Sequence, residues 1–317
     1  MYTDNSILES AERSRRMSYQ SVTLDETIHI DAIYTIHYFE YMNTFAFTGE
    51  RHDFWEFCYA DKGEVGITVE NNYTVIKKGD IVFHEPNEFH NVTATGASAP
   101  NLVVISFRCN SPAMDFFRKK FLHIDEIERT LLANIIVEAR NCFEGRLDDP
   151  YQTVMKKCSS PLLGAEQLIR IYLEQFLLHI SRRYLSGPVI SSKIPKATKS
   201  RNDNEIFNHV VDYLEKHLNA HVTIEQICRD TLIGRSQLQK IFKERCGLGI
   251  IEYFSNMKVD AAKEMIRMNH LNFTQISEKL GYTSIHYFSR QFKKITGMTP
   301  SEYASSIKAL SNGSFET

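Results

Sequence analysis

The sequence predicts an α+β chain of several domains, with a β-rich N-terminal part, helices after it, and an all-α C-terminal domain that holds two helix-turn-helix units. Three observations predict this fold. Short β-type segments fill residues 28–108, apolar residues recur at the helical period from Pro112 onward, and one C-terminal segment occurs twice. The length of 317 residues suits two or three domains.

The β-rich part is predicted from short runs of aromatic and β-branched residues. Asn71 and Asn72 predict a hairpin turn, because Asn tolerates a positive φ. The expected strands cover residues 34–42, 55–59, 65–69, 73–76, 81–83, 89–92 and 102–107. Many short strands at this spacing are typical of a barrel or a sandwich.

The middle part has helical periodicity at residues 124–142 and 162–184. The second helix is apolar around much of its circumference, so it either docks on the β-rich part or pairs with another subunit. Residues 186–204 combine Pro, Ser, Gly and basic residues without periodicity, which predicts a linker.

Composition excludes several classes of protein. No apolar run reaches the roughly 18 residues of a membrane span, and the N-terminus lacks the apolar core of a secretory signal. The six cysteines include no C-x-x-C pair, so we expect reduced thiols in a cytoplasmic protein rather than a disulfide framework or a zinc finger. The net charge is −2, but residues 201–317 are net positive.

The internal repeat is the strongest signal. Residues 242–253 align without gaps with residues 292–303, and Thr223 and Asn272 each stand three residues before a Gln, which predicts two capped helix starts. Each copy is expected to hold a short helix, a tight turn and a second helix; Gly281 ends the first helix of the second copy and Ser284 caps the next.

The second helix of each copy has a polar, basic outer face. These faces carry Ser236, Gln239, Lys240 and Lys243 in one copy, and His286, Ser289, Arg290 and Lys293 in the other. Such a face suits the major groove of DNA. The alternative is that it is an ordinary helix face exposed to solvent, with no role in DNA binding. A continuous helix at residues 251–268, about 27 Å long, could hold both about one DNA turn apart, ~34 Å.

Residues 281–303 resemble the signature of AraC/XylS-type regulators, and the resemblance covers residues 205–308. It implies that both second helices enter adjacent major grooves, with base contacts at Ser236, Gln239, Lys240, Ile285, His286 and Arg290. There are departures. Gly234 stands where the family often has Ser, and Lys258 stands where it usually has Arg. Ile285 cannot hydrogen-bond a base edge, so it would touch a thymine methyl or serve as packing.

Residues 30–108 resemble the cupin pattern through His52, Glu56, Gly63, Pro86 and His90, which implies a cupin-like β-barrel. A small effector inside it is the favoured interpretation. The candidate lining residues are Tyr38, His52, Trp55, Glu56, Tyr59 and His90. His52, Glu56 and His90 match three cupin metal ligands, but Glu50 stands where the other His belongs. No metal, cofactor or catalytic residue is therefore assigned.

The predicted domains are the β-domain with its N-terminal extension (1–110), a helical segment for possible dimerisation (111–185), the linker (186–204), the DNA-binding domain (205–308) and a tail (309–317). The favoured function is a transcription regulator, not an enzyme, with double-stranded DNA and a small-molecule effector as partners. The resemblance also implies activation, a homodimer, contact with RNA polymerase and a carbohydrate effector. A cupin metalloenzyme and an adaptor that acts through protein contacts are the alternatives.

Overall fold

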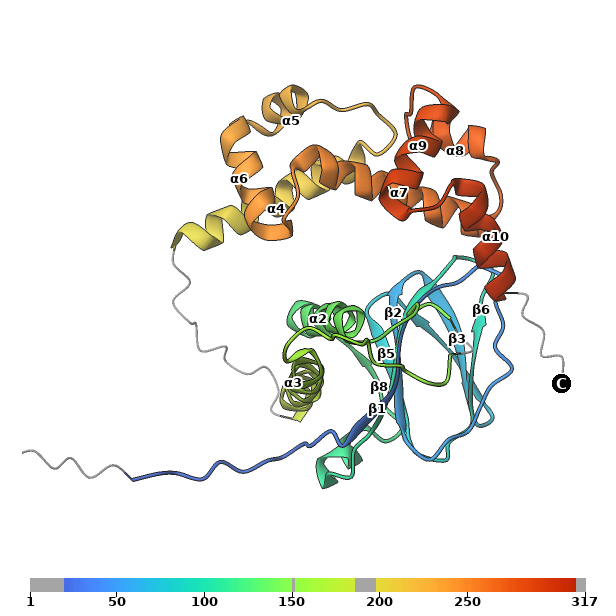
Figure 1. The fold of residues 1–317 in the computed structure, drawn as a ribbon, viewed down its shortest axis with the longest axis vertical. Coiled ribbons are helices and arrows are strands. Elements are labelled where there is room, and N and C mark those ends of the chain that lie inside the picture. Colours follow the sequence, from blue (N-terminus) through green and yellow to red (C-terminus); the bar gives the residue numbers. More distant parts are fainter. Residues whose placement is uncertain (1–19, 150–151, 186–197, 312–317) are drawn as a thin grey trace, which may run out of the picture.

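The structure is a computed structural model that describes residues 20–149, 152–185 and 198–311. Figure 1 shows an N-terminal part with the strands and two long helices, and a C-terminal helical domain that lies along one side of it. The predictions for residues 1–19, 186–197 and 312–317 lie outside the described residues. No described helix is both long and apolar enough to cross a membrane.

The described strands form two antiparallel sheets. The larger sheet has the order β1-β7-β2-β5-β8; its strands are β1 (Ala32–Glu40), β2 (Trp55–Lys62), β5 (Asp80–His84), β7 (Asn101–Arg108) and β8 (Phe121–His123). The smaller sheet has the order β4-β3-β6; its strands are β3 (Glu64–Val69), β4 (Asn72–Lys77) and β6 (His90–Ala94).

The two sheets do not close into the continuous barrel that the cupin resemblance implied. Isolated bridges join Ala46 to Thr93 and Glu50 to His90, but residues 41–54 otherwise run between the sheets as an irregular segment. Apolar side chains of both sheets pack in the space between them, among them Phe39, Ile67 and Val104. The N-terminal part is therefore an open two-sheet structure with one cupin-like interior.

The hairpin between β3 and β4 turns one residue earlier than predicted. Val69 pairs with Asn72, so Glu70 and Asn71 form the turn, and Glu70 has the positive φ, 50°. The backbone N–H of Glu70 donates to the carbonyl of Phe89, and its carboxylate accepts from the N–H of Phe89. These contacts stabilise a backbone conformation that Glu disfavours on its own.

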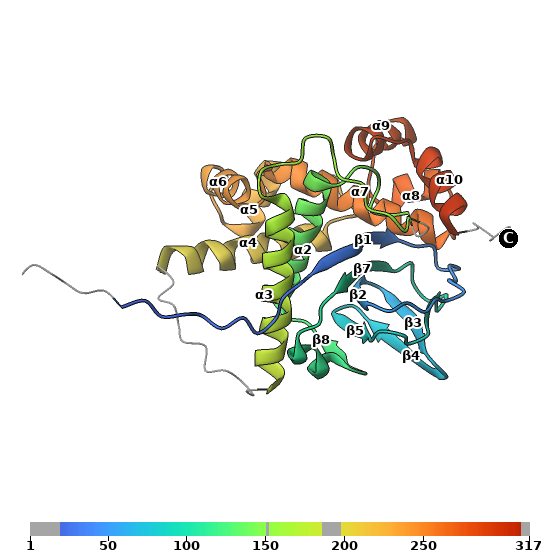
Figure 2. The same cartoon turned by 60° about the horizontal axis from the view of Figure 1, so that its bottom comes forward.

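Two helices cover the other face of the larger sheet. Helix α2 (Glu126–Cys142) and helix α3 (Ala165–Leu185) lie side by side in Figures 1 and 2. A short 3-10 helix, η1 (Pro112–Phe117), precedes β8. The ring of Phe176 on α3 lies 5.5 Å from that of Phe57 on β2, in the core that α3 shares with the sheet. Of the two predicted alternatives, docking of this helix on the β-rich part is thus the one that the structure contains.

The C-terminal domain consists of seven described helices. They are α4 (Thr198–Lys216), α5 (Ile224–Thr231), α6 (Arg235–Cys246), α7 (Ile250–Met268), α8 (Phe273–Lys279), α9 (Ile285–Thr296) and α10 (Pro300–Ser311). Helix α4 begins inside the range predicted as linker. A helix that is already nucleated can extend into polar residues, because each added residue gains one backbone hydrogen bond without a new nucleation cost.

Long helix α7 connects two separate cores. Its first half contributes Ile250 and Phe254 to a core with α4, α5 and α6, and its second half contributes Val259 and Ile266 to a core with α8, α9 and α10. Each copy of the repeat therefore folds around its own core, and α7 fixes the spacing between the copies.

Candidate DNA interface and effector cavity

The helix starts of both copies follow from local hydrogen bonds. Thr223 and Asn272 each form a full capping box with the Gln three residues later, as predicted. Ser284 accepts a hydrogen bond from the N–H of Tyr287 and so caps α9, whereas Gly234 gives α6 no side-chain cap. Gly281 has the predicted positive φ, 64°.

Helix α6 exposes the polar face that the sequence predicts. Leu238, Ile241 and Phe242 are buried, and the face opposite to them is exposed. It carries Ser236, Gln239, Lys240 and Lys243. Two of these make contacts within the helix region: Lys243 Nζ donates to the carbonyl of Gly247 at 2.7 Å, and Lys240 pairs with Glu244 at 3.8 Å.

Helix α9 has a similar arrangement. Phe288 and Phe292 are buried at its base. The predicted contact residues His286, Arg290 and Lys293 are exposed, whereas Ile285 and Ser289 are half-buried. Tyr287 is also exposed, with the guanidinium of Arg290 5.6 Å from its ring centre. Tyr287 was not among the residues predicted from the sequence to contact DNA.

Lys258 on α7 joins the two copies. Its Nζ donates to the carbonyl of Ala220, before the first unit, at 2.6 Å and to that of Leu280, inside the second unit, at 2.7 Å. Burial lowers the pKa of Lys258 to about 8. A buried cation that fastens both units to one helix fixes the orientation of α6 relative to α9.

A cavity lies between the two sheets of the N-terminal part and is called the inter-sheet cavity here. It has a volume of about 270 Å³ and an aromatic lining that includes Tyr34, Phe39, Tyr41, Phe47 and Phe54. Three predicted effector residues, His52, Glu56 and His90, line it as well. An aromatic cavity with a few convergent polar groups is typical of a small-molecule site.

The other three predicted lining residues do not reach this cavity, which corrects the prediction. Trp55 and Tyr59 lie in the core between the larger sheet and the helices. Successive residues of a strand point to opposite faces, so Glu56 on β2 faces the cavity and its neighbour Trp55 faces away. Tyr38 on β1 also points away from the cavity, and its hydroxyl donates to Asp61 at 3.1 Å.

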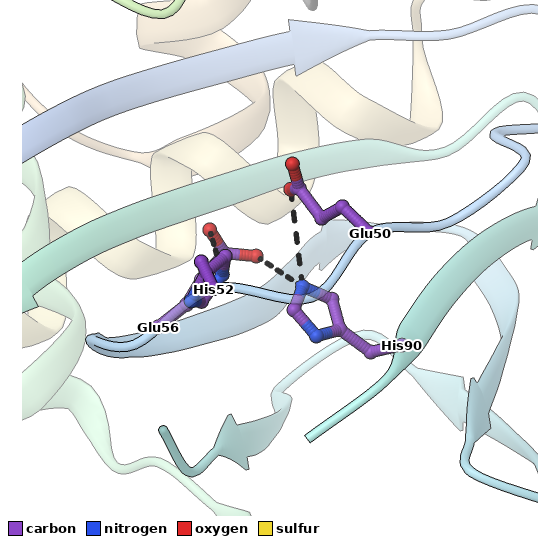
Figure 3. A group of neighbouring side chains, drawn as sticks. All are labelled: Glu50, His52, Glu56 and His90. Atoms are coloured by element: carbon purple, nitrogen blue, oxygen red, sulfur yellow. Dashed lines mark ion pairs between the residues drawn. The ribbon is translucent and has the colours of Figure 1, made fainter. Parts of the chain in front are cut away.

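Four side chains at one end of the cavity form the His–Glu cluster: Glu50, His52, Glu56 and His90 (Figure 3). Nε2 of His90 lies 3.2 Å from Glu56 and 3.9 Å from Glu50, and Nε2 of His52 lies 3.6 Å from Glu56. The hydroxyl of Ser106 donates to Glu56 at 2.5 Å. Three of the four residues were singled out in the sequence.

Electrostatics in the cluster follow from burial and proximity. Burial alone would raise the pKa of Glu56, but the two histidines hold it well below its ordinary value. Burial alone would lower the pKa of His90, but Glu56 raises it above the ordinary value. Burial and the charge of Glu56 raise the pKa of Glu50. The cluster thus favours positive charge on or between its members.

The Glu40 contact connects the two parts of the chain. Glu40, at the end of β1, pairs with Lys263 at 2.9 Å and with Arg267 at 3.8 Å, and it accepts a 2.6 Å hydrogen bond from the hydroxyl of Tyr303. Arg267 is only 2% exposed. Met42 adds an apolar contact to the core of the second unit. A cleft of about 630 Å³ borders this contact, which leaves space for it to rearrange.

Two family profiles match the chain. The family described as AraC-like ligand binding domain matches residues 33–118, and the family described as helix-turn-helix domain matches residues 227–306. The first match covers the strands around the inter-sheet cavity, and the second covers α6 and α9.

Curated relatives match the chain over different lengths. An uncharacterized HTH-type transcriptional regulator, YfiF of Bacillus subtilis, is 20% identical over 90% of both chains. The lactose operon transcription activator of Staphylococcus xylosus is 29% identical over 36% of this chain and 42% of its own length. An uncharacterized HTH-type transcriptional regulator of Staphylococcus aureus is 25% identical over 78% of this chain. This chain spans less than half the length of these last two relatives.

Solved structures resemble the chain weakly in overall superposition. Fatty acid-bound ToxT of Vibrio cholerae has a TM-score of 0.33 and 16% identity, over 93% of this chain and 100% of that one. The C-terminal domain of AraT of Geobacillus stearothermophilus has a TM-score of 0.31 and 26% identity, over 32% of this chain and 84% of that one.

Proposed function

Because this chain belongs to the AraC/XylS family of transcription regulators, we propose that it reads operator DNA through α6 and α9 under the control of a small molecule in the inter-sheet cavity. Its helix-turn-helix domain binds DNA and its N-terminal domain is of the ligand-binding type. We propose which residues contact DNA, which class of effector binds, and how the effector controls DNA binding.

The proposal that this chain reads operator DNA depends on one observation. Both second helices of the repeat expose polar, basic faces, and α7 connects their two units through the hydrogen bonds of Lys258. Two recognition helices fixed in this way suit two successive major grooves on one side of a duplex. Exposed Arg290 and Gln239 carry the groups that read guanine and adenine edges.

A gel-shift or anisotropy titration at graded salt tests this. The probes are the chain's own upstream region and a scrambled duplex of the same length. We expect tighter binding to the upstream region at every salt concentration, because base contacts add to the phosphate contacts. Equal affinity for both duplexes would contradict sequence-specific reading.

Effector control is proposed to pass along β1. Phe39 lines the inter-sheet cavity, and the next residue, Glu40, faces the C-terminal domain. A ligand that packs against Phe39 would shift the end of β1 and change the Glu40 contact, so ligand binding and domain arrangement become linked equilibria.

A carbohydrate remains the proposed effector class. Aromatic faces beside a few polar groups suit a sugar ring, and one relative is named a lactose operon activator. Thermal-shift measurements with a panel of sugars test this proposal. If one sugar stabilises the protein and also changes its DNA affinity, a carbohydrate effector is supported. If no sugar stabilises the protein, a carbohydrate effector is excluded.

We further propose that the protein acts in the cytoplasm and has no catalytic activity. We also propose that it is a homodimer and that it contacts RNA polymerase when it activates transcription. Apolar side chains of α3 support the dimer, since Ile171 is 42% and Leu185 70% exposed. Light scattering at graded concentration tests it. The metalloenzyme alternative has no support among the relatives, which are regulators.

A further inference from the structure

Both histidines of the His–Glu cluster have one ring nitrogen committed to the backbone. Nδ1 of His52 donates to the carbonyl of Phe54 at 3.0 Å, and Nδ1 of His90 donates to that of Glu88 at 3.1 Å. In each ring Nε2 is then the nitrogen that faces the cluster. Orientation of a histidine by a backbone carbonyl is the arrangement that metal-ligating histidines use.

The Nε2 atoms of the two histidines form no hydrogen bonds with the carboxylates of the cluster. Nε2 of His52 and Nε2 of His90 are buried and have no hydrogen bond of acceptable geometry to any described residue. This holds although Glu56 lies 3.6 Å from the first and 3.2 Å from the second. The two Nε2 atoms and the carboxylate oxygens of Glu56 are therefore close together without hydrogen bonds between them. A positive ion at a point between these atoms would contact all of them at once.

The separations match the edges of a metal coordination sphere. Metal–ligand distances of about 2.0–2.1 Å in a tetrahedron place neighbouring ligand atoms about 3.3 Å apart. The separations of Nε2 from carboxylate oxygen are 3.2, 3.6 and 3.9 Å, and all four ligand atoms lie within 4.8 Å of one another. Only small movements would bring them onto one ion.

The surroundings hold the cluster in place. Ser106 donates to Glu56, and His84 stacks on His90 with ring centres 4.1 Å apart. His90 is 2% exposed and Glu56 7%, whereas Glu50 is more exposed. All four cluster residues line the inter-sheet cavity, so a bound ion would have one side open to a ligand in that cavity.

We propose that Glu50, His52, Glu56 and His90 bind one divalent first-row transition-metal ion, and that an oxygen atom of the effector adds a fifth ligand. Two imidazole nitrogens with carboxylate oxygens favour Zn²⁺, Fe²⁺, Co²⁺ or Ni²⁺ over Mg²⁺ and Ca²⁺, which prefer oxygen ligands alone. Coordination of the effector by the ion rests on the proposed sensing function. The metal site itself does not.

Direct titration of the full-length protein tests the site. After dialysis against a chelator, the protein is titrated with Zn²⁺ by calorimetry and with Co²⁺ by visible absorption. We expect one ion per chain, a d–d band typical of nitrogen and oxygen ligands, and no uptake of Mg²⁺. Absence of Zn²⁺ and Co²⁺ uptake by the folded wild-type protein would overturn the proposal.

Variants separate this site from adventitious binding. His90→Gln and His52→Gln are expected to abolish the Co²⁺ band, and Ser106→Ala, which removes a support of Glu56, is expected to weaken binding about 10- to 100-fold. The matched control is His123→Gln, since His123 is an exposed histidine paired with Asp80. Uptake that survives both ligand variants, or that the control removes, would contradict the assignment.

DNA affinity is measured on the same samples. Metal uptake without any change in DNA binding would leave the site intact and remove only its link to regulation. Loss of sequence-specific DNA binding in both metal-free and metal-loaded protein would contradict the proposed function while the metal site stands.

Discussion

The hydroxyl of Tyr303 on α10 donates a 2.6 Å hydrogen bond to Glu40 at the end of β1. The same carboxylate is the ion-pair partner of Arg267, which is 2% exposed. Burial alone would raise the pKa of Glu40, but Lys263 and Arg267 lower it. The carboxylate of Glu40 lies on the N-terminal side of the interface. It compensates the buried positive charge of Arg267 in the C-terminal domain.

Glu40→Gln is expected to loosen the interface. The amide keeps the shape of the side chain but removes the charge, which we expect to cost about 2–3 kcal/mol of docking energy. Hydrogen exchange should become faster at the end of β1 and in α10, while the rest of the chain keeps its protection. Glu126→Gln is the control, because its pair with Arg129 is exposed. Equal protection in wild type and Glu40→Gln would contradict the role of this contact.

The Glu40 contact should also depend on pH. Its pKa is lowered in the folded protein, so its contribution to stability is fully present above the ordinary carboxyl pKa of about 4.5 and is lost as the pH falls through the lowered value. The difference in melting temperature between wild type and Glu40→Gln should therefore stay constant from pH 7 to about pH 5 and shrink over the range below about pH 4.5. A difference that stays constant over this range would mean that the charge of Glu40 is not what matters.

Arg290→Ala on α9 should weaken operator binding by about 1–3 kcal/mol, which is roughly 5- to 150-fold. The loss should be larger for the operator than for scrambled DNA, because the side chain is expected to read a base. Lys77→Ala removes an exposed positive charge on β4, outside the helix-turn-helix domain, and should leave affinity unchanged. Equal losses in the two variants would point to a general charge effect.

Lys258→Met tests the clamp between the two units. The change leaves the carbonyls of Ala220 and Leu280 without their partner, at a cost of at least about 2 kcal/mol. We expect a lower melting temperature and weaker operator binding, with Lys258→Arg close to wild type. Lys279→Met, at the exposed end of α8, is the control. Full stability of Lys258→Met would show that α7 alone orients the units.

Gly281→Ala should destabilise the C-terminal domain by about 1–3 kcal/mol. The glycine has φ 64°, and a Cβ there would lie 2.4 Å from the carbonyl oxygen of Asn219. Gly297→Ala is the matched control: its φ is 80°, but a Cβ there meets nothing within 4 Å. Chemical denaturation compares the two. Equal losses would show that backbone strain alone, not the close approach of the first unit, decides the cost.

The two helix-turn-helix units could be predicted because their signals are local. A capping box such as that of Asn272 forms within four residues, and the apolar spacing of Phe288 and Phe292 defines the buried face of α9 directly. The orientation of Tyr287 was missed, since spacing alone does not show which side of a short helix its neighbours leave uncovered.

The cavity was only partly predictable for a different reason. On a strand, a shift of one residue changes the face, so the sequence could not show that Glu56 faces the cavity while Trp55 and Tyr59 face the helices. The Glu40 contact could not be predicted at all, because its partners lie in another domain and no local pattern connects them.

The most direct test of the account is a hydroxyl-radical footprint of the full-length protein on its own upstream region. We expect two protected windows per bound chain on one face of the duplex, about 10 base pairs apart. Variants of α6 (Gln239→Ala) and α9 (Arg290→Ala) should each weaken a different window. A single window, or protection that does not depend on sequence, would contradict the claim that both helices read DNA together.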